Sequence, residues 1–136
     1  MKNKFRLGYK IYKNVIDINI INKWLNTFKE DDSQFHAHSD LLWEIRQNNS
    51  IKNLFGKIWN ISSDKLCSSF DGAYLRKSTE ESFILDWHVD QDGSHINSCV
   101  SIQGVLALTK IDKNTGGTSF LSKSHILHNK LIPKNK

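Results

Sequence analysis

The chain has 136 residues and a formal net charge of +5; its 38% hydrophobic content suits one domain with a core and excludes an extended disordered chain. No stretch approaches the roughly 20 apolar residues of a membrane span, and the basic N-terminus lacks the apolar segment of a secretory signal. Two cysteines do not form a disulfide framework, so we expect an intracellular, cytoplasmic protein without a membrane partner.

The first half of the chain has the periodicity of helices. One helix is predicted at about residues 15–30, and its apolar face comprises Ile18, Ile21, Leu25 and Phe28. A short second helix is predicted around residues 41–45, with Ser39 or Asp40 as its N-cap. A third helix is predicted over residues 51–59 behind an N-cap at Ser50. Its apolar stripe requires a sheet or another helix to cover it.

From about residue 65 the apolar residues alternate with a period of about 2, which is typical of β-strands. Asp-Gly and Gly-Gly pairs separate the segments, as turns would. The predicted strands are LCSSF (66–70), AYLRK (73–77), SFILDWHV (82–89), SCVSIQGVLALT (98–109) and TSFLS (118–122). Helices followed by strands favour an α+β architecture. Four or five strands do not close a barrel, so we expect a sheet with an unpaired edge.

The positive charge lies at the two ends of the chain. Residues 1–13 and 123–136 contain nine Lys or Arg residues and no acid, whereas residues 14–122 carry a net charge of −4. Neither end interleaves aromatic residues with bases in the manner of a stacking platform, so we do not expect a nucleic-acid partner. We expect residues 1–13 and 129–136 to be basic, flexible tails.

His88 and Asp90 are the residue pair with the clearest chemical meaning. On a strand, residues i and i+2 point to the same side about 6.5–7 Å apart, so an imidazole and a carboxylate can converge on one ion. Such a pair supplies two of the three ligands in the 2-His-1-carboxylate triad of non-haem Fe(II) oxygenases. By itself the pair is a weak signal, because a histidine hydrogen-bonded to a nearby aspartate is the ordinary alternative.

The motifs around this pair add context. In chain order they are SFDG (69–72), WHVDQ (87–91), CVSIQG (99–104), the Gly116-Gly117 pair, Ser122 and the KSH triplet (123–125). In this order the chain resembles the phytanoyl-CoA dioxygenase-like branch of the Fe(II)- and 2-oxoglutarate-dependent oxygenases, over residues 35–128. The resemblance implies a single, partial dioxygenase-like domain over residues 1–136. Its N-terminal helices would pack on an incomplete double-stranded β-helix, a jelly-roll or cupin-like sheet.

The resemblance also implies roles for individual residues. His88 and Asp90 would bind Fe(II), with Trp87 packed behind them and Gln91 steering the aspartate or lining the pocket. Gln103 would face 2-oxoglutarate, although core packing for Trp87 and a satisfied polar group for Gln103 are the alternatives. The residues implied in a structural turn are Gly116, Gly117 and His125, next to Lys123, which stands where the family has glycine.

The chain departs from the family pattern downstream of these motifs. The family's distal histidine and its 2-oxoglutarate-binding arginine would come after residue 136, and no arginine follows Arg76. His125 or His128 could serve as a third ligand. We therefore expect a dioxygenase-type hydroxylase, inactive alone, that acts on a small organic substrate if active. The alternative is a non-enzymatic protein whose open sheet edge pairs with a second polypeptide or with another copy of itself.

Overall fold

The computed structural model describes residues 5–30, 36–69, 72–74, 86–90, 101–115 and 117–131, and for residues 128–131 it describes the backbone alone. The chain divides into two compact units. The three-helix unit comprises Tyr12–Ser78 and Leu108–Lys110. The discontinuous unit comprises Met1–Ile11, Thr79–Ala107 and Ile111–Lys136.

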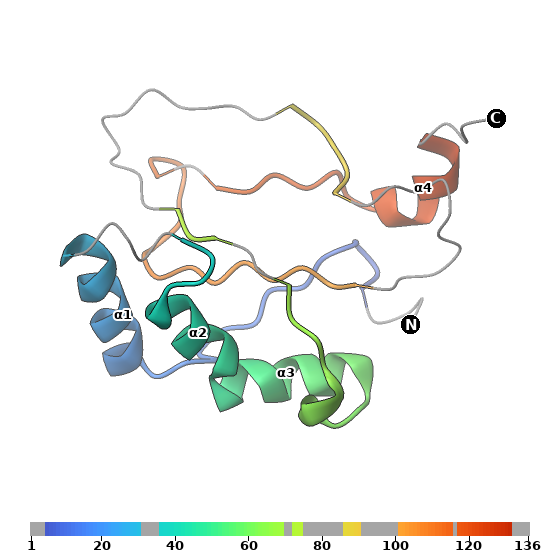
Figure 1. The fold of residues 1–136 in the computed structure, drawn as a ribbon. Coiled ribbons are helices and arrows are strands. Elements are labelled where there is room, and N and C mark those ends of the chain that lie inside the picture. Colours follow the sequence, from blue (N-terminus) through green and yellow to red (C-terminus); the bar gives the residue numbers. More distant parts are fainter. Residues whose placement is uncertain are drawn as a thin grey trace. The chain divides into compact units, whose positions relative to one another are not determined.

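Helices form most of the regular structure in the described residues (Figure 1). The three-helix unit contains α1 (Ile18–Glu30), α2 (Asp40–Gln47), α3 (Asn49–Trp59) and the short 3-10 helix η2 (Ser63–Lys65). The discontinuous unit contains α4 (Ser124–Leu131). Within the described ranges, no helix has the length and apolar character needed to cross a membrane.

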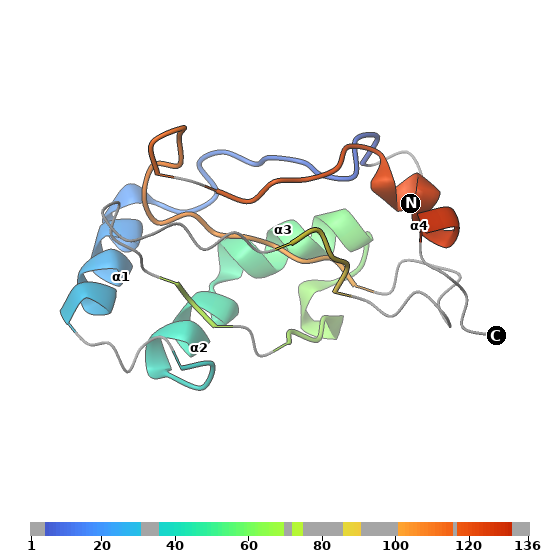
Figure 2. The same cartoon turned by 90° about the horizontal axis from the view of Figure 1, so that it is seen from above.

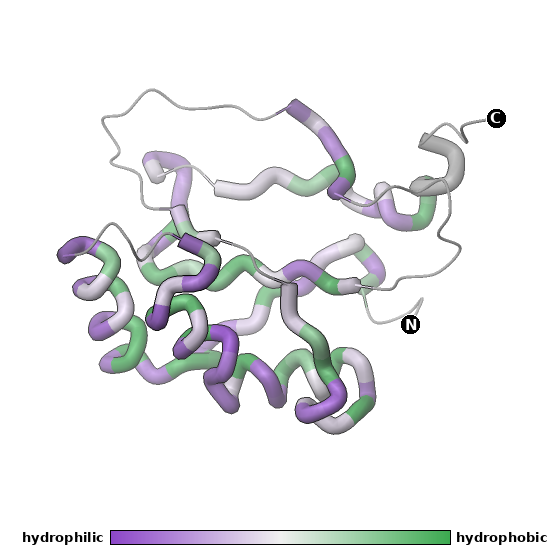
Figure 3. The backbone as a smooth tube through the Cα atoms, viewed as in Figure 1, coloured by the Kyte–Doolittle hydropathy of each residue, from purple (hydrophilic) through white to green (hydrophobic). Residues whose placement is uncertain are grey.

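The core of the three-helix unit is built by α1 and α2. Its buried side chains are Trp24, Phe28, Leu41 and Leu42, and packed against them are Ile16, Ile21, Ile45, Ile51, Ala73 and Leu108. Each of these helices contains both hydrophobic and hydrophilic residues, as an amphipathic helix requires (Figure 3). The buried face of α1 is centred on Trp24, which is fully buried, whereas Ile18 is 65% exposed. The prediction of a helix was therefore confirmed. Phe28 is buried and Ile21 packs against the core as expected, whereas Ile18 is exposed and Trp24, at the centre of the buried face, was not among the predicted residues.

The helix caps follow the sequence in one case and depart from it in another. The hydroxyl of Ser39 accepts a hydrogen bond from the Leu42 N–H at 3.4 Å, which confirms Ser39 as the N-cap of α2. The N-cap of α3 is Asn48, whose Oδ1 accepts from the backbone N–H groups of Ser50 and Ile51. The N–H of Asn48 also closes the end of α2 by donating to the Ile45 carbonyl. The prediction of Ser50 as the cap was wrong because Asn48 ends one helix and begins the next.

A polar contact joins α1 to α2 at the margin of the core. The indole Nε1–H of the buried Trp24 donates to Glu44 Oε1 at 3.0 Å, and Lys23 Nζ lies 2.9 Å from the same oxygen. The hydrogen bond from Trp24, followed by that from Lys23, lowers the pKa of the Glu44 carboxyl below its usual value. Glu44 thus satisfies the polar end of the largest core side chain.

Glu44→Gln is expected to reduce the acid sensitivity of the fold. Because the folded-state pKa of Glu44 is depressed, its contribution to stability is present above the unfolded-state pKa of about 4.3 and is lost as the pH falls through the folded value. The variant should therefore be less stable than the wild type near neutral pH, and this difference should shrink on acidification. Urea unfolding at a series of pH values would measure it.

Trp24→Phe provides the matched variant for this experiment. It keeps Glu44 but removes the N–H group that is the largest cause of the lowered pKa, so it should also flatten the pH dependence. Parallel pH profiles for the wild type and Glu44→Gln would contradict the role given to this contact.

The predicted strands are the part of the fold that the structure contradicts. No strand forms in the described parts of these segments, which are residues 66–69, 73–74, 86–89, 101–109 and 118–122. The described structure is instead 41% helix without β-strands, so the fold is not α+β, and the expected jelly-roll or cupin-like sheet was wrong. The sheet edge that was expected to pair with a second polypeptide or another copy is likewise not found in the described residues.

The failure has a physical reason. A strand is stable only when a second backbone lies beside it and pairs its N–H and C=O groups. Among the described residues, no backbone hydrogen bond joins 102–107 to another segment. Two neighbouring apolar side chains of this segment are exposed, Val105 at 68% and Leu106 at 37%. The alternating apolar pattern in the sequence therefore indicated a segment able to form a strand, but it gave no information about whether another segment lies beside it.

Candidate metal site

His88 and Asp90 lie in the described stretch 86–90 of the discontinuous unit. His88 Nε2 lies 3.3 Å from Asp90 Oδ1, and both side chains are about half exposed, at 51% and 58%. No strand holds these residues, but bends at Trp87 and Asp90 bring the two side chains together all the same. The predicted convergence of an imidazole and a carboxylate is present, on a bent segment instead of a strand.

The second ring nitrogen of His88 is held by the main chain. Its Nδ1 lies 2.7 Å from the backbone carbonyl oxygen of Asp86. A carbonyl oxygen only accepts, so Nδ1 carries a proton and donates it, and in the neutral ring Nε2 presents its lone pair beside Asp90. Metal-ligating histidines are oriented in the same way, through a hydrogen bond from their other ring nitrogen.

Sequence reasoning missed the contribution of Asp86. The group that contacts His88 is a main-chain carbonyl, which every residue carries, so residue type gave no signal. The position two residues before the histidine was the only clue, and it is informative only when the local bend is known. The carboxylate of Asp86 has no part in this contact.

The pair can serve as two neighbouring ligands of one divalent cation. Ligand atoms in adjacent positions of an octahedral ion, each about 2.1 Å from it, are about 3.0 Å apart, close to the observed 3.3 Å. No cluster of three or more potential ligands (His, Cys, Asp or Glu) is found in the part of the chain that the structure describes. With a protonated ring and no cation, the same contact is an exposed ion pair, which contributes little to stability.

The residues predicted to surround the pair are only partly brought to it. Trp87 lies beside it in the sequence and is 73% exposed. Gln103 is exposed. Gln91 and Gly116 lie outside the described residues.

The predicted turn residues have close neighbours in the discontinuous unit. Gly8 has a φ of +91°, and a Cβ there would lie 2.8 Å from Nδ1 of His125. A Cβ on Gly117 would lie 2.9 Å from the Ile111 side chain. His125 therefore packs against a turn near the N-terminus, where only glycine leaves room for its ring.

Lys123→Gly is expected to stabilise the protein by about 0.5–1 kcal/mol. Lys123 has a left-handed φ of +65° and donates its backbone N–H to the Leu7 carbonyl at 2.9 Å. Glycine adopts this conformation without steric cost and keeps the hydrogen bond. Urea unfolding would measure the change. Lys113→Gly is the control, because Lys113 is not among the residues with positive φ, and an equal effect of both variants would contradict the prediction.

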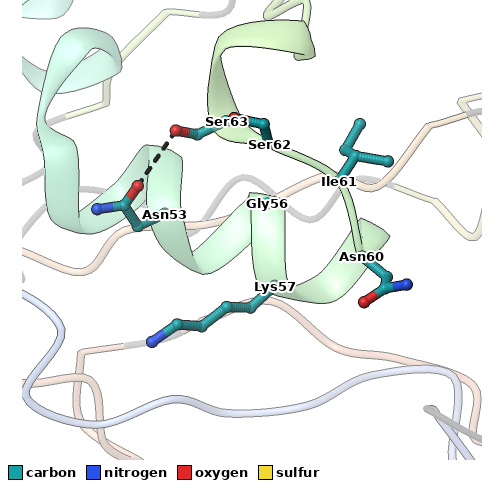
Figure 4. Close-up of a pocket in the computed structure, with 7 residues that line it drawn as sticks. All are labelled: Asn53, Gly56, Lys57, Asn60, Ile61, Ser62 and Ser63. Carbon is teal, nitrogen blue, oxygen red and sulfur yellow. Dashed lines mark hydrogen bonds between the residues drawn. The ribbon is translucent and has the colours of Figure 1, made fainter.

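A shallow hollow of about 550 Å³ lies at the C-terminal end of α3 (Figure 4). Its lining residues are Asn53, Gly56, Lys57, Asn60, Ile61, Ser62 and Ser63. The Ser63 hydroxyl donates to Asn53 Oδ1 at 3.1 Å, and the Ile61 N–H donates to the Gly56 carbonyl at 3.0 Å. Lys57 is the one charged side chain among these lining residues. The hollow thus lacks a nucleophile with an adjacent base, and its polar groups serve to end the helix.

Comparisons with protein-family models, with curated proteins and with solved structures find no match to this chain. The resemblance to the phytanoyl-CoA dioxygenase-like branch therefore rests on the motifs around His88 and Asp90.

Proposed function

We propose that this chain carries the metal-binding pair of an Fe(II)- and 2-oxoglutarate-dependent dioxygenase of the phytanoyl-CoA dioxygenase type. His88 and Asp90 are two of the iron ligands in this proposal. The observation that supports it most directly is the 3.3 Å approach of His88 Nε2 to Asp90 Oδ1, with the opposite ring nitrogen held by the Asp86 carbonyl.

The donor set fits the metal. One imidazole nitrogen and one carboxylate oxygen are the ligand types that Fe(II) takes from proteins in 2-His-1-carboxylate sites. Asp90 brings one negative charge to the divalent ion, and the Asp86 carbonyl fixes the tautomer in which His88 Nε2 is free to bind. Both side chains are half exposed, so an ion can reach them from solvent.

Bound iron together with 2-oxoglutarate would supply the activation of O₂ for hydroxylation of a small organic substrate. The contribution of this chain is to hold two adjacent coordination positions and to keep the imidazole ring from rotating. Among the described residues, no third His, Cys, Asp or Glu lies with the pair, so this chain contributes two ligands in the proposal.

The test is an anaerobic calorimetric titration of the full chain with Fe(II), with and without 2-oxoglutarate. We expect binding in the micromolar range that strengthens when 2-oxoglutarate is present. His88→Ala and Asp90→Asn should each weaken Fe(II) binding by about tenfold or more, because each removes a ligand atom.

Two matched variants make the result specific. Asp86→Asn keeps the backbone carbonyl that contacts His88, so it should bind Fe(II) like the wild type. His36→Ala removes another exposed histidine, in the three-helix unit, and should also have no effect. Equal Fe(II) binding by the wild type and His88→Ala would reject the proposal, as would equal losses in Asp86→Asn and Asp90→Asn.

A further inference from the structure

Two segments from opposite ends of the chain lie against each other in the discontinuous unit. The Lys123 N–H donates to the Leu7 carbonyl at 2.9 Å. The rings of Tyr9 and Phe120 stack, with their centroids 5.5 Å apart and their planes 18° from parallel. Figure 2 shows residues 5–11 running alongside residues 117–123.

The stacked rings are open to solvent on this surface. Phe120 is 58% exposed and Tyr9 is 39% exposed. With Ile11 and Thr118 they line a shallow hollow of about 310 Å³. Nearly parallel aromatic faces beside a hollow offer a planar surface on which a further ring can stack.

The charge on the same two segments is positive. Residues 5–11 and 117–127 contain Arg6, Lys10 and Lys123 and no Asp or Glu. Arg6 precedes the residue that is hydrogen-bonded to Lys123, so the backbone contact places these two cations at the same end of the ring stack. Cations beside exposed aromatic faces are the combination that binds the phosphates and bases of single-stranded nucleic acid.

We propose that the surface formed by Arg6, Tyr9, Phe120 and Lys123 binds single-stranded nucleic acid. A base stacks on the Tyr9–Phe120 pair, and the neighbouring phosphates contact the two cations. An acidic peptide would pair with the cations but would leave the aromatic faces unused, so nucleic acid is the better fit. This proposal is independent of the metal pair, since none of its residues belongs to the stretch 86–90.

The structure also explains why the sequence argued against this partner. Neither end of the chain alone interleaves aromatic residues with bases as a stacking platform does. In the folded chain, Tyr9 from one end stacks on Phe120 from the other. The backbone hydrogen bond between Lys123 and Leu7 brings Lys123 close to Arg6, the residue before Leu7. The platform is therefore a property of the fold.

The test is fluorescence anisotropy of a labelled oligodeoxythymidine of about 12 nucleotides, long enough to span one binding site of this kind. Binding to the full chain should weaken as NaCl rises, with a slope of log K against log salt of about −1.4 for two phosphate contacts on a single strand. Tyr9→Ala and Phe120→Ala should each weaken binding by about tenfold. Tyr74→Ala is the matched control, because Tyr74 is 88% exposed in the other unit.

Conservative variants separate stacking from folding. Phe120→Tyr keeps an aromatic face and should bind like the wild type, whereas Phe120→Leu keeps an apolar side chain and should lose as much affinity as Phe120→Ala. Equal binding by Phe120→Leu and Phe120→Tyr would overturn the proposal. Competition by polyglutamate as effective as that by the oligonucleotide would also overturn it and would identify an acidic polypeptide as the partner.

Discussion

Trp24→Ala is expected to lower the free energy of unfolding by about 3–5 kcal/mol, as large-to-small substitutions of buried aromatic residues do. Trp24 is the one side chain among the described residues that is both large and fully buried. Its removal would leave a cavity bounded by Phe28, Leu41 and Leu42. It would also leave Glu44 without its indole partner. Since domains have only about 5–15 kcal/mol of stability, a large fraction of the free energy of unfolding would be lost.

The measurement is urea unfolding followed by far-UV circular dichroism, with Trp43→Ala as the matched control. Trp43 lies on α2 but is 38% exposed, and its ring lies under the Arg46 guanidinium at 5.6 Å. Losing that exposed contact should cost about 1 kcal/mol or less. Equal destabilisation by the two substitutions would contradict the location of the core.

The helices could be predicted because their signal is local. Apolar spacing of 3.6 and capping residues are read within one segment, and α1, α2 and α3 all occur where they were expected. The errors arose where contacts with other helices determine which of several nearby residues is buried or acts as the cap. Trp24, not Ile18, faces α2, and Asn48, not Ser50, caps α3 because it also ends α2.

The strands could not be predicted reliably, because a strand is defined by its partner. The segment 98–109 has the composition of a strand, yet its described residues show no regular structure. The pairing that would have made it a strand depends on residues far away in the sequence. Alternation therefore could not distinguish a paired segment from an unpaired one.

In the candidate sites, too, contacts between residues close in the sequence were easier to predict than contacts between distant ones. His88 and Asp90 are two residues apart, and their side chains lie 3.3 Å from each other although the segment that carries them is not a strand. The carbonyl of Asp86 could not be foreseen, because main-chain groups leave no mark in the sequence. The contact of Tyr9 with Phe120 could not be predicted because the two residues lie near opposite ends of the sequence.

Hydrogen exchange is expected to separate the helices from the formerly predicted strands by about a thousandfold in rate. Interior amides of α1 and α3 are hydrogen-bonded within helices, and opening those of α1 disrupts the core around Trp24. Amides of residues 102–107 have no backbone partner among the described residues, so they should exchange at rates close to those of an unstructured chain. Mass spectrometry of the full chain after brief and long exposure to D₂O would measure both.

The pattern within residues 102–107 is the decisive part of this experiment. In an edge strand of an antiparallel sheet, every second amide points toward the neighbouring strand and is protected. Slow exchange at alternate positions of this segment, comparable with that of α1, would therefore reinstate a sheet and contradict the helical fold. Uniformly fast exchange would show that the segment is not part of a sheet, which agrees with the exposure of Val105.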